Sequence, residues 1–344
     1  MPSAKAESMA HAIIPDSLLD EITRALSKFG VYGCHIVLVK GHLSHASSTI
    51  GTINGKDLMR IGDTLPTRVI GQLIRLSALH HALASKGHSL STPIKEYIPE
   101  LKMGESGVAD KINAIDLASH MSGLPTSIET NEKDIGSHNI LDKLGSIQPV
   151  HPFRSTYHET DIAQLAFEAI IERLTNQNYT AWIKAEVFDH LRMRFSTITE
   201  DESTSTPDQD QHMEKGRFCH SNGRDVLKFL RDLPKSPTYE ELIKPYAENV
   251  EYPLIKSPET ASSCLGLKKA SYNGKDTYEK YSIGADFGDL FGEVAGKGDD
   301  ENARLAVLCK FGEGVTVEQG QEFLAYIRGI LIQHLTEVSV GPVE

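Results

Sequence analysis

Cysteine is scarce in this 344-residue chain, and its few thiols stand far apart. The four cysteines are Cys34, Cys219, Cys264 and Cys309, and no two of them form a C-x-x-C pair. Zinc knuckles and disulfide frameworks need closely spaced cysteines, so the sequence argues against both. No cluster of histidines, cysteines and carboxylates has the spacing of zinc or calcium ligands either. We therefore expect neither a metal nor another cofactor.

The chain also lacks an excess of basic residues and a long apolar run. It holds 35 lysines and arginines against 47 aspartates and glutamates, which gives a formal net charge of −12. A surface of this sign disfavours nucleic acid and anionic membranes as partners. No run approaches the length of a membrane span, and the start of the chain has no apolar core typical of a secretion signal. A cytoplasmic protein is expected, and its oligomeric state stays open.

An ordered series of helix and strand signals fills the rest of the chain. Helices are predicted over 15–29, from about residue 70 to Gly87, over 225–232 and over 322–335, and strands over 34–39, 264–267, 278–284 and 305–311. Asn54-Gly55 and Asn273-Gly274 are typical of hairpin turns. Strands near both termini with helices between them predict an α/β fold. We assign 1–65 and 240–344 to a sheet domain, and 66–239 to a mainly helical inserted domain.

The stretch from Thr64 to Gly87 is central to the prediction. Apolar residues fall near helical spacing, and Gly87 stands where a helix C-terminus favours a left-handed residue. A second informative stretch, from Ile112 to Pro125, contains His120-Met-Ser122-Gly-Leu-Pro. A third contains Tyr157-His-Glu159, followed by Ile170-Ile-Glu-Arg.

Together these stretches resemble the serine β-lactamase and penicillin-binding-protein family, and most of all its esterase and fungal transesterase branch. In that family the motifs read T-L-F-R-I-G-S-x-T-K, H-x-S-G-L-P and Y-S-N … I-I-E-R. The resemblance covers roughly residues 15–335. It implies a transpeptidase-like fold, in which an antiparallel sheet flanked by the terminal helices carries an inserted helical domain.

The family's catalytic serine and lysine have no counterpart in a gap-free comparison. Counting back from Gly87 places Ile70 at the serine and Leu73 at the lysine. A hydroxyl nucleophile needs a nearby base, and neither residue supplies one. A slipped comparison would place Asp63 or Thr64 at the nucleophile, but it needs an insertion before Gly87 and puts Pro66 at the lysine.

Tyr157 keeps the tyrosine of the family's Y-x-N motif, and Glu159 replaces its asparagine. Both are predicted as catalytic residues, provided that the backbone there is not yet helical, because helical spacing would point them apart. In an apolar cavity Glu159 would have a raised pKa and could act as an acid or base. The alternative is an ion-paired surface glutamate at a helix start.

The remaining cleft positions are weaker predictions. The family's oxyanion strand resembles Tyr281-Ser282-Ile-Gly284-Ala-Asp286, where Gly284 would let the backbone approach a ligand. The predicted substrate-binding residues are Ile70, Leu73, His158, His220, Ser282, Gly284 and Asp286. His120 and Ser122 are interpreted as structural.

The predicted function is that of a non-hydrolytic enzyme, a cyclase, isomerase or pericyclase of secondary-metabolite biosynthesis. It would act on a small hydrophobic substrate in the old acyl-transfer cleft, because such reactions need orientation and one acid or hydrogen-bond donor. Two alternatives stay open. The chain could be an esterase or transesterase with an unorthodox nucleophile, or a non-catalytic protein that binds a small molecule.

Overall fold

The protein is described from a computed structural model, which covers residues 13–41, 44–103, 107–126, 139–160, 162–199, 217–250, 261–296 and 302–337. Its helices are α2 (Asp16–Phe29), α3 (Val69–Ala84), α4 (Ile94–Tyr97), α5 (Ala114–Ala118), α6 (Asn139–Leu144), α7 (Ile162–Thr175), α8 (Tyr179–Ile183), α9 (Gly223–Asp232), α10 (Tyr239–Ile243) and α11 (Val317–Glu337), with a π-helical turn at Lys184–Asp189 and a 3₁₀ turn at Leu233–Lys235.

Antiparallel strands form two sheets in this part of the chain. The strands are β1 (Val31–Lys40), β2 (Ser44–Gly51), β3 (Leu65–Thr67), β4 (Thr197–Thr199), β5 (Phe218–Ser221), β6 (Ala247–Val250), β7 (Ala261–Ser263), β8 (Lys268–Tyr272), β9 (Lys275–Ile283), β10 (Phe287–Val294) and β11 (Ala303–Phe311). The large sheet has the order β2-β1-β11-β10-β9-β8-β7-β6, and the small one β3-β5-β4. The predicted α/β fold with an antiparallel sheet is confirmed.

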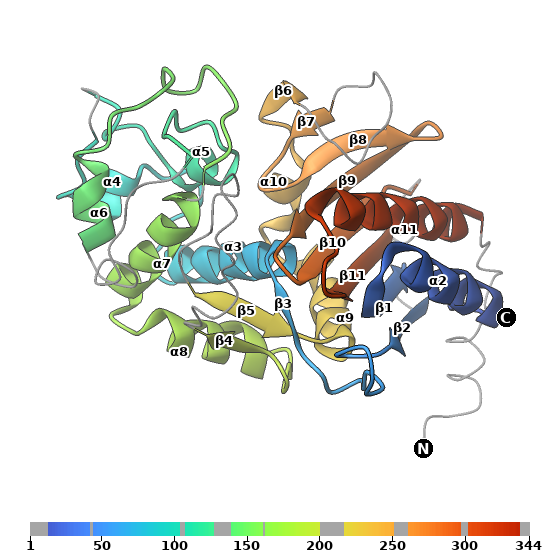
Figure 1. The fold of residues 1–344 in the computed structure, drawn as a ribbon. Helices are drawn as coiled ribbons and strands as arrows, with labels where there is room; N and C mark the ends of the chain where they lie inside the picture. Colours follow the sequence, from blue (N-terminus) through green and yellow to red (C-terminus); the bar gives the residue numbers. More distant parts are fainter. Residues whose placement is uncertain are drawn as a thin grey trace, which may run out of the picture.

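The large sheet is buried on both faces because its central strands are apolar at successive positions. In β1, Ile36 and Leu38 pack with α2 and α11, whereas Val37 and Val39 pack with α3 and α9. This alternation follows the two-residue period of a strand. Figure 1 shows α2 and α11 side by side on one face of the sheet, with α3 and the other helices beyond its opposite face.

Helix α3 runs through the middle of the molecule and is buried along nearly its whole length. A helix that is apolar all round needs neighbours on every side, and α3 packs against α7, α8 and β10 (Figure 1). Its end is as predicted. Gly87 has a φ of +78°, and the next residue, His88, donates its N–H to the carbonyl of Leu83. Gly87 and this hydrogen bond therefore fix the point at which the chain leaves α3.

The turns on either side of β8 were predicted with different success. Asn273 and Gly274 both have positive φ values and join β8 to β9, as predicted for a hairpin. The strand signal at 264–267 is wrong, because this stretch forms a tight turn around Gly266, whose φ is +74°. The division at residues 65/66 and 239/240 stays a prediction. None of the described helices is long and apolar enough to cross a membrane.

Candidate functional site

A half-open pocket lies where α3 meets α7, the end of α5 and the turn between β7 and β8. About 330 Å³ of space lies in and over it, with the open solvent at its mouth included. Its lining residues are Gln72, Leu73, Leu76, Ala118, His120, Ala163, Gln164, Phe167, Leu265 and Gly266. Mostly apolar walls with a few polar groups are typical of sites for small organic molecules. Of the predicted substrate-binding residues, Leu73 lies in this wall.

The first turn of α3 carries only hydrocarbon at the two positions that the resemblance assigns to serine and lysine. Ile70, the second residue of α3, is 0% exposed, and Leu73 contributes to the pocket wall. Neither side chain has a lone pair that could attack a carbonyl or accept a proton. Asp63 and Thr64 lie in the loop before β3 and are not among the residues that line the pocket. The comparison that equates these positions with the family's serine and lysine stays a prediction.

A buried carboxylate, Asp289 of β10, caps the start of α3. Its Oδ2 accepts hydrogen bonds from the Thr67 hydroxyl at 2.9 Å and from the N–H groups of Val69 and Ile70 at 2.8 and 3.4 Å. Burial raises the pKa of Asp289 to about 6, although these hydrogen bonds lower it. The anion satisfies N–H groups that a helix start leaves without partners, so it ties α3 to the sheet.

Tyr157 lies before α7 in backbone that is not helical, as the sequence argument required. Its ring packs edge-on against His120, with ring centroids 5.6 Å apart, and the Nζ of Lys268 lies 3.5 Å from its centroid. Burial and the nearby Glu159 carboxylate raise the pKa of Tyr157 above its usual value of 10. The phenol therefore stays protonated near neutral pH and can act as a hydrogen-bond donor.

Glu159 has the opposite character to the one predicted for an apolar cavity. Its Oε1 lies 3.6 Å from the Nζ of Lys280 on β9, and its side chain is 58% exposed. The charge of Lys280 lowers the pKa of Glu159 to about 2, and nearby His120 and Lys268 add to this. Of the two alternatives that the sequence left open, the ion-paired glutamate fits and the raised pKa does not, because Lys280 lies on β9 two positions before Ser282. Glu159 is an ion-paired carboxylate and a poor proton carrier at neutral pH.

Burial lowers the pKa of two nitrogens at or beside the pocket, those of His120 and Lys268. Burial lowers the pKa of His120 to about 3, and its Nδ1 accepts a hydrogen bond from the N–H of Thr160 at 3.2 Å. The ring proton is therefore on Nε2. Burial also lowers the pKa of Lys268 to about 7, helped by the charge of Lys280 and opposed by that of Glu159. A cluster of Tyr157, Glu159, Lys268 and Lys280 thus adjoins the pocket through His120.

The structure places the other predicted residues outside this cluster. His158 contacts the hydroxyl of Thr126 at 3.1 Å, and His220 lies on β5 between β3 and β4. Ser282 pairs with Asp289 across β9 and β10, and Asp286 forms an ion pair with Lys310.

Gly284 was predicted to leave room for a ligand, but that room is filled by protein. A Cβ at Gly284 would lie 2.2 Å from the Cε1 of Phe287. The glycine is required by the packing of this aromatic ring in the β9–β10 hairpin. Nothing in this contact calls for a ligand there.

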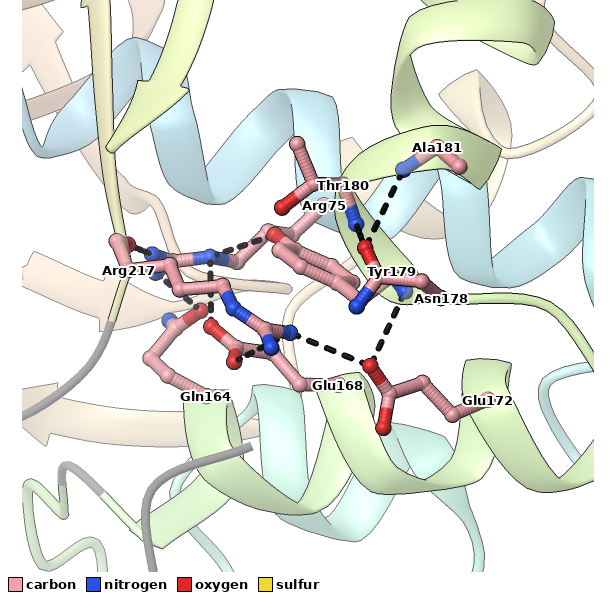
Figure 2. A network of polar contacts seen from close by, with 9 residues as sticks. All are labelled: Arg75, Gln164, Glu168, Glu172, Asn178, Tyr179, Thr180, Ala181 and Arg217. Carbon is pink, nitrogen blue, oxygen red and sulfur yellow. Dashed lines mark hydrogen bonds and ion pairs between the residues drawn. The ribbon is translucent and has the colours of Figure 1, made fainter. Parts of the chain in front are cut away.

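A buried network of charges lies behind the pocket and was not predicted (Figure 2). Arg75 of α3 donates to the Tyr179 hydroxyl at 2.9 Å and to the Gln164 side chain at 3.1 Å. Arg217 lies 3.1 Å from Glu172 and 3.8 Å from Glu168. Because Gln164 also lines the pocket, the network sets the orientation of one of its polar walls.

The cluster residues that the sequence analysis missed are Lys268 and Lys280. Lys280 could have been found, because side chains two apart on a strand share a face and Ser282 was already a candidate. Lys268 gave no such signal, since it belongs to an ordinary strand pattern, Lys-Lys-Ala-Ser-Tyr. The described residues contain no group of three histidines, cysteines or carboxylates that could hold a metal ion.

Comparison with known proteins identifies the family. The sequence profile described as Beta-lactamase matches residues 76–256, which is more than half of the chain. The chain belongs to the beta-lactamase family. The matched region of this beta-lactamase family member includes α3 from Leu76 onward, the pocket walls on α5 and α7, and Tyr157. A search of curated proteins finds no match at the sequence level.

Solved structures share the fold with this family member at low sequence identity. A beta-lactamase/D-alanine carboxypeptidase from Yersinia pestis, complexed with citrate, has a TM-score of 0.69 at 14% identity, over 92% of this chain and 99% of the other. An octameric penicillin-binding protein homologue from Pyrococcus abyssi gives 0.68 at 14%, over 91% and 77%. The D-amino acid amidase of Ochrobactrum anthropi SV3, complexed with D-phenylalanine, gives 0.67 at 15%, over 93% and 98%. These likenesses establish the fold alone.

Proposed function

We propose that this family member is a non-hydrolytic enzyme that cyclises or isomerises a small, mainly apolar molecule, in natural-product biosynthesis. The observation that carries the proposal is the hydrocarbon character of Ile70 and Leu73 at the start of α3. Without a hydroxyl and a base at these positions, an acyl-enzyme intermediate has no atom from which to form there. The pocket beside them keeps mostly apolar walls, which suit a hydrophobic substrate.

The polar cluster supplies chemistry that needs no covalent acyl step. The Tyr157 phenol remains protonated and can donate a hydrogen bond to a substrate oxygen on which negative charge develops. Lys280 contributes positive charge, and Glu159 holds Lys280 in place. A donor fixed in a site of low dielectric stabilises developing charge more strongly than water does, which favours enolisation, ring closure and related rearrangements.

The first test asks whether the protein converts a small molecule into another compound. Purified protein would be incubated with a small-molecule extract and with a panel of apolar carbonyl compounds, and the mixture compared before and after by liquid chromatography with mass spectrometry. We expect one compound to be converted by the wild-type protein into an isomer of the same mass. The same compound should remain unconverted when it is incubated with the Tyr157→Phe variant. A compound that binds but is never altered would indicate a binding protein instead.

The second candidate is an esterase or transesterase with an unorthodox nucleophile. It is favoured by the names of two similar structures, a carboxypeptidase and an amidase. A nitrophenyl ester distinguishes the candidates. Repeated turnover of the ester to the free acid, a product whose mass shows the addition of water, would support the hydrolase and contradict our proposal.

A further inference from the structure

Two adjacent lysines at the start of β8 have very different surroundings. Lys269 forms an ion pair with Asp276 at 2.8 Å, and this hydrogen bond raises its pKa. Lys268 is 9% exposed, and its Nζ is buried with no hydrogen-bond partner among the described residues. Folded proteins rarely bury a lysine amine without pairing it, because desolvating the ammonium costs free energy. Lys268 therefore needs an explanation that Lys269 does not.

The position of Lys268 places its amine next to the pocket. Leu265 and Gly266, which line the pocket, lie in the turn that leads directly into Lys268 at the start of β8. Its Nζ lies 3.5 Å from the centroid of the Tyr157 ring, and that ring packs against His120, another lining residue. The amine thus contacts an aromatic ring that packs against a residue of the pocket wall.

We propose that Lys268 is an amine nucleophile that forms an imine with an aldehyde or ketone substrate of this pocket. The lone pair of Nζ forms a bond to the carbonyl carbon, and the two protons of the neutral amine leave with the carbonyl oxygen as water. The imine nitrogen keeps a double bond to carbon, and no oxidant or reductant is consumed. The face of the Tyr157 ring lies against this amine.

Both conditions that activate a lysine are present. Burial in an apolar setting and a second cation nearby each favour the neutral, nucleophilic amine. Burial is the larger cause of the lowered pKa of Lys268, and Lys280 is the cation. Charged and titratable groups around it also include Glu159, Cys264, Tyr157 and His120.

The inference deepens the proposed function and rests on it. A protonated imine withdraws electrons from the neighbouring carbon, so it promotes proton transfer or carbon–carbon bond formation at that carbon. These are the steps that an isomerase or cyclase needs. The substrate class becomes a small apolar carbonyl compound.

Trapping the imine tests the inference on the full chain. Hexanal would be added near pH 7 with sodium cyanoborohydride, which reduces imines to stable amines, and peptides would be mapped by mass spectrometry. We expect Lys268 to be alkylated at least about tenfold faster than Lys269, because a larger fraction of its amine is neutral. Equal rates, or no product at Lys268, would overturn the inference.

Matched variants separate this role from a structural one. Lys268→Met should fold with unchanged or greater stability, since it keeps an apolar stem and removes a buried amine, and it should lose the fast-reacting site. Lys269→Met should keep that site. A marked loss of stability in Lys268→Met, together with slow alkylation of the wild-type residue, would show a structural lysine.

The outcomes for the two proposals are distinguishable. If a compound is isomerised in the conversion assay but Lys268 is not trapped by hexanal or by that compound, the imine inference is wrong and the proposed function stands. If Lys268 is trapped rapidly while no compound is converted, the amine is reactive as inferred and the proposed function fails.

Discussion

The Oε1 of Glu159 lies 3.6 Å from the Nζ of Lys280, across the space between the segment before α7 and strand β9. This ion pair joins the helical part of the chain to the sheet beside the candidate site. It also gives Glu159 and Tyr157 different roles, because the glutamate stays ionised while the phenol stays protonated.

Tyr157→Phe should therefore affect turnover more than Glu159→Gln does. Removing one fixed hydrogen-bond donor to developing charge typically lowers a rate by about a hundredfold to a thousandfold. The glutamine keeps the volume of Glu159 but loses the attraction to Lys280, so we expect a smaller fall. Rates would be measured with the compound found in the conversion assay. If both variants work at the wild-type rate, the chemistry lies elsewhere or depends on shape alone.

The double variant Ile70→Ser with Leu73→Lys should not become an esterase. Groups that act as a unit in catalysis do not recover one at a time, and Glu159 and the strand around Ser282 also differ from the family pattern. Hydrolysis of a nitrophenyl ester, with the wild type as control, measures this. Strong turnover by the double variant would show that the rest of the acyl-transfer machinery is intact.

Asp289 should make stability fall as the pH rises from about 4 to about 6. Its pKa is raised from 3.8 to about 6, so the folded protein binds this proton more tightly than the unfolded chain does. Its contribution is most favourable below the unfolded pKa and decreases until the folded pKa is passed. The difference amounts to about 3 kcal/mol at most. Urea unfolding of wild type and Asp289→Asn across this range would show it.

The asparagine variant should lack this dependence, because its side chain does not titrate. A control, Asp289→Ala, removes the cap of α3 as well and should lose about 1–3 kcal/mol at every pH. Parallel pH profiles for wild type and Asp289→Asn would mean that Asp289 does not titrate in this range.

The contribution of Glu168 to stability should also fall as the pH rises, but over a higher pH range than that of Asp289. Burial raises its pKa to about 7, against the attraction of Arg75 and Arg217. The stability that it contributes should therefore fall between about pH 4.5 and pH 7. Glu168→Gln should remove this slope. The matched control is Glu172→Gln, which breaks the contact with Arg217 and should lower stability without removing the slope. A slope lost in the control instead would assign the titration to Glu172.

Much of the fold was predictable because local signals and family motifs agreed. The helix that ends at Gly87, the Asn273-Gly274 hairpin and the closing helix all follow from spacing and turn chemistry. The turn at 264–267 was missed because its residues are as apolar as those of a buried strand, and Gly266 carried the only hint of a bend.

The candidate site was less predictable than the fold. Tyr157 and Glu159 were found through a motif, but the pKa of Glu159 depends on Lys280, which lies far away in sequence on β9. The Arg75 network likewise joins α3 to α7 and to Arg217 across more than 140 residues, as its hydrogen bond to the Arg217 carbonyl shows. Charge partners brought together by tertiary packing leave no periodic trace in one sequence.

The most direct test of the central claim, that no acyl-enzyme forms in this cleft, is the intact mass of the protein after exposure to a fluorophosphonate probe. A serine hydrolase in the same solution would serve as the positive control. We expect the control to gain one probe per chain while the mass of this protein stays unchanged. A stoichiometric adduct on this chain, mapped to any residue of the pocket or of the loop containing Asp63 and Thr64, would contradict it.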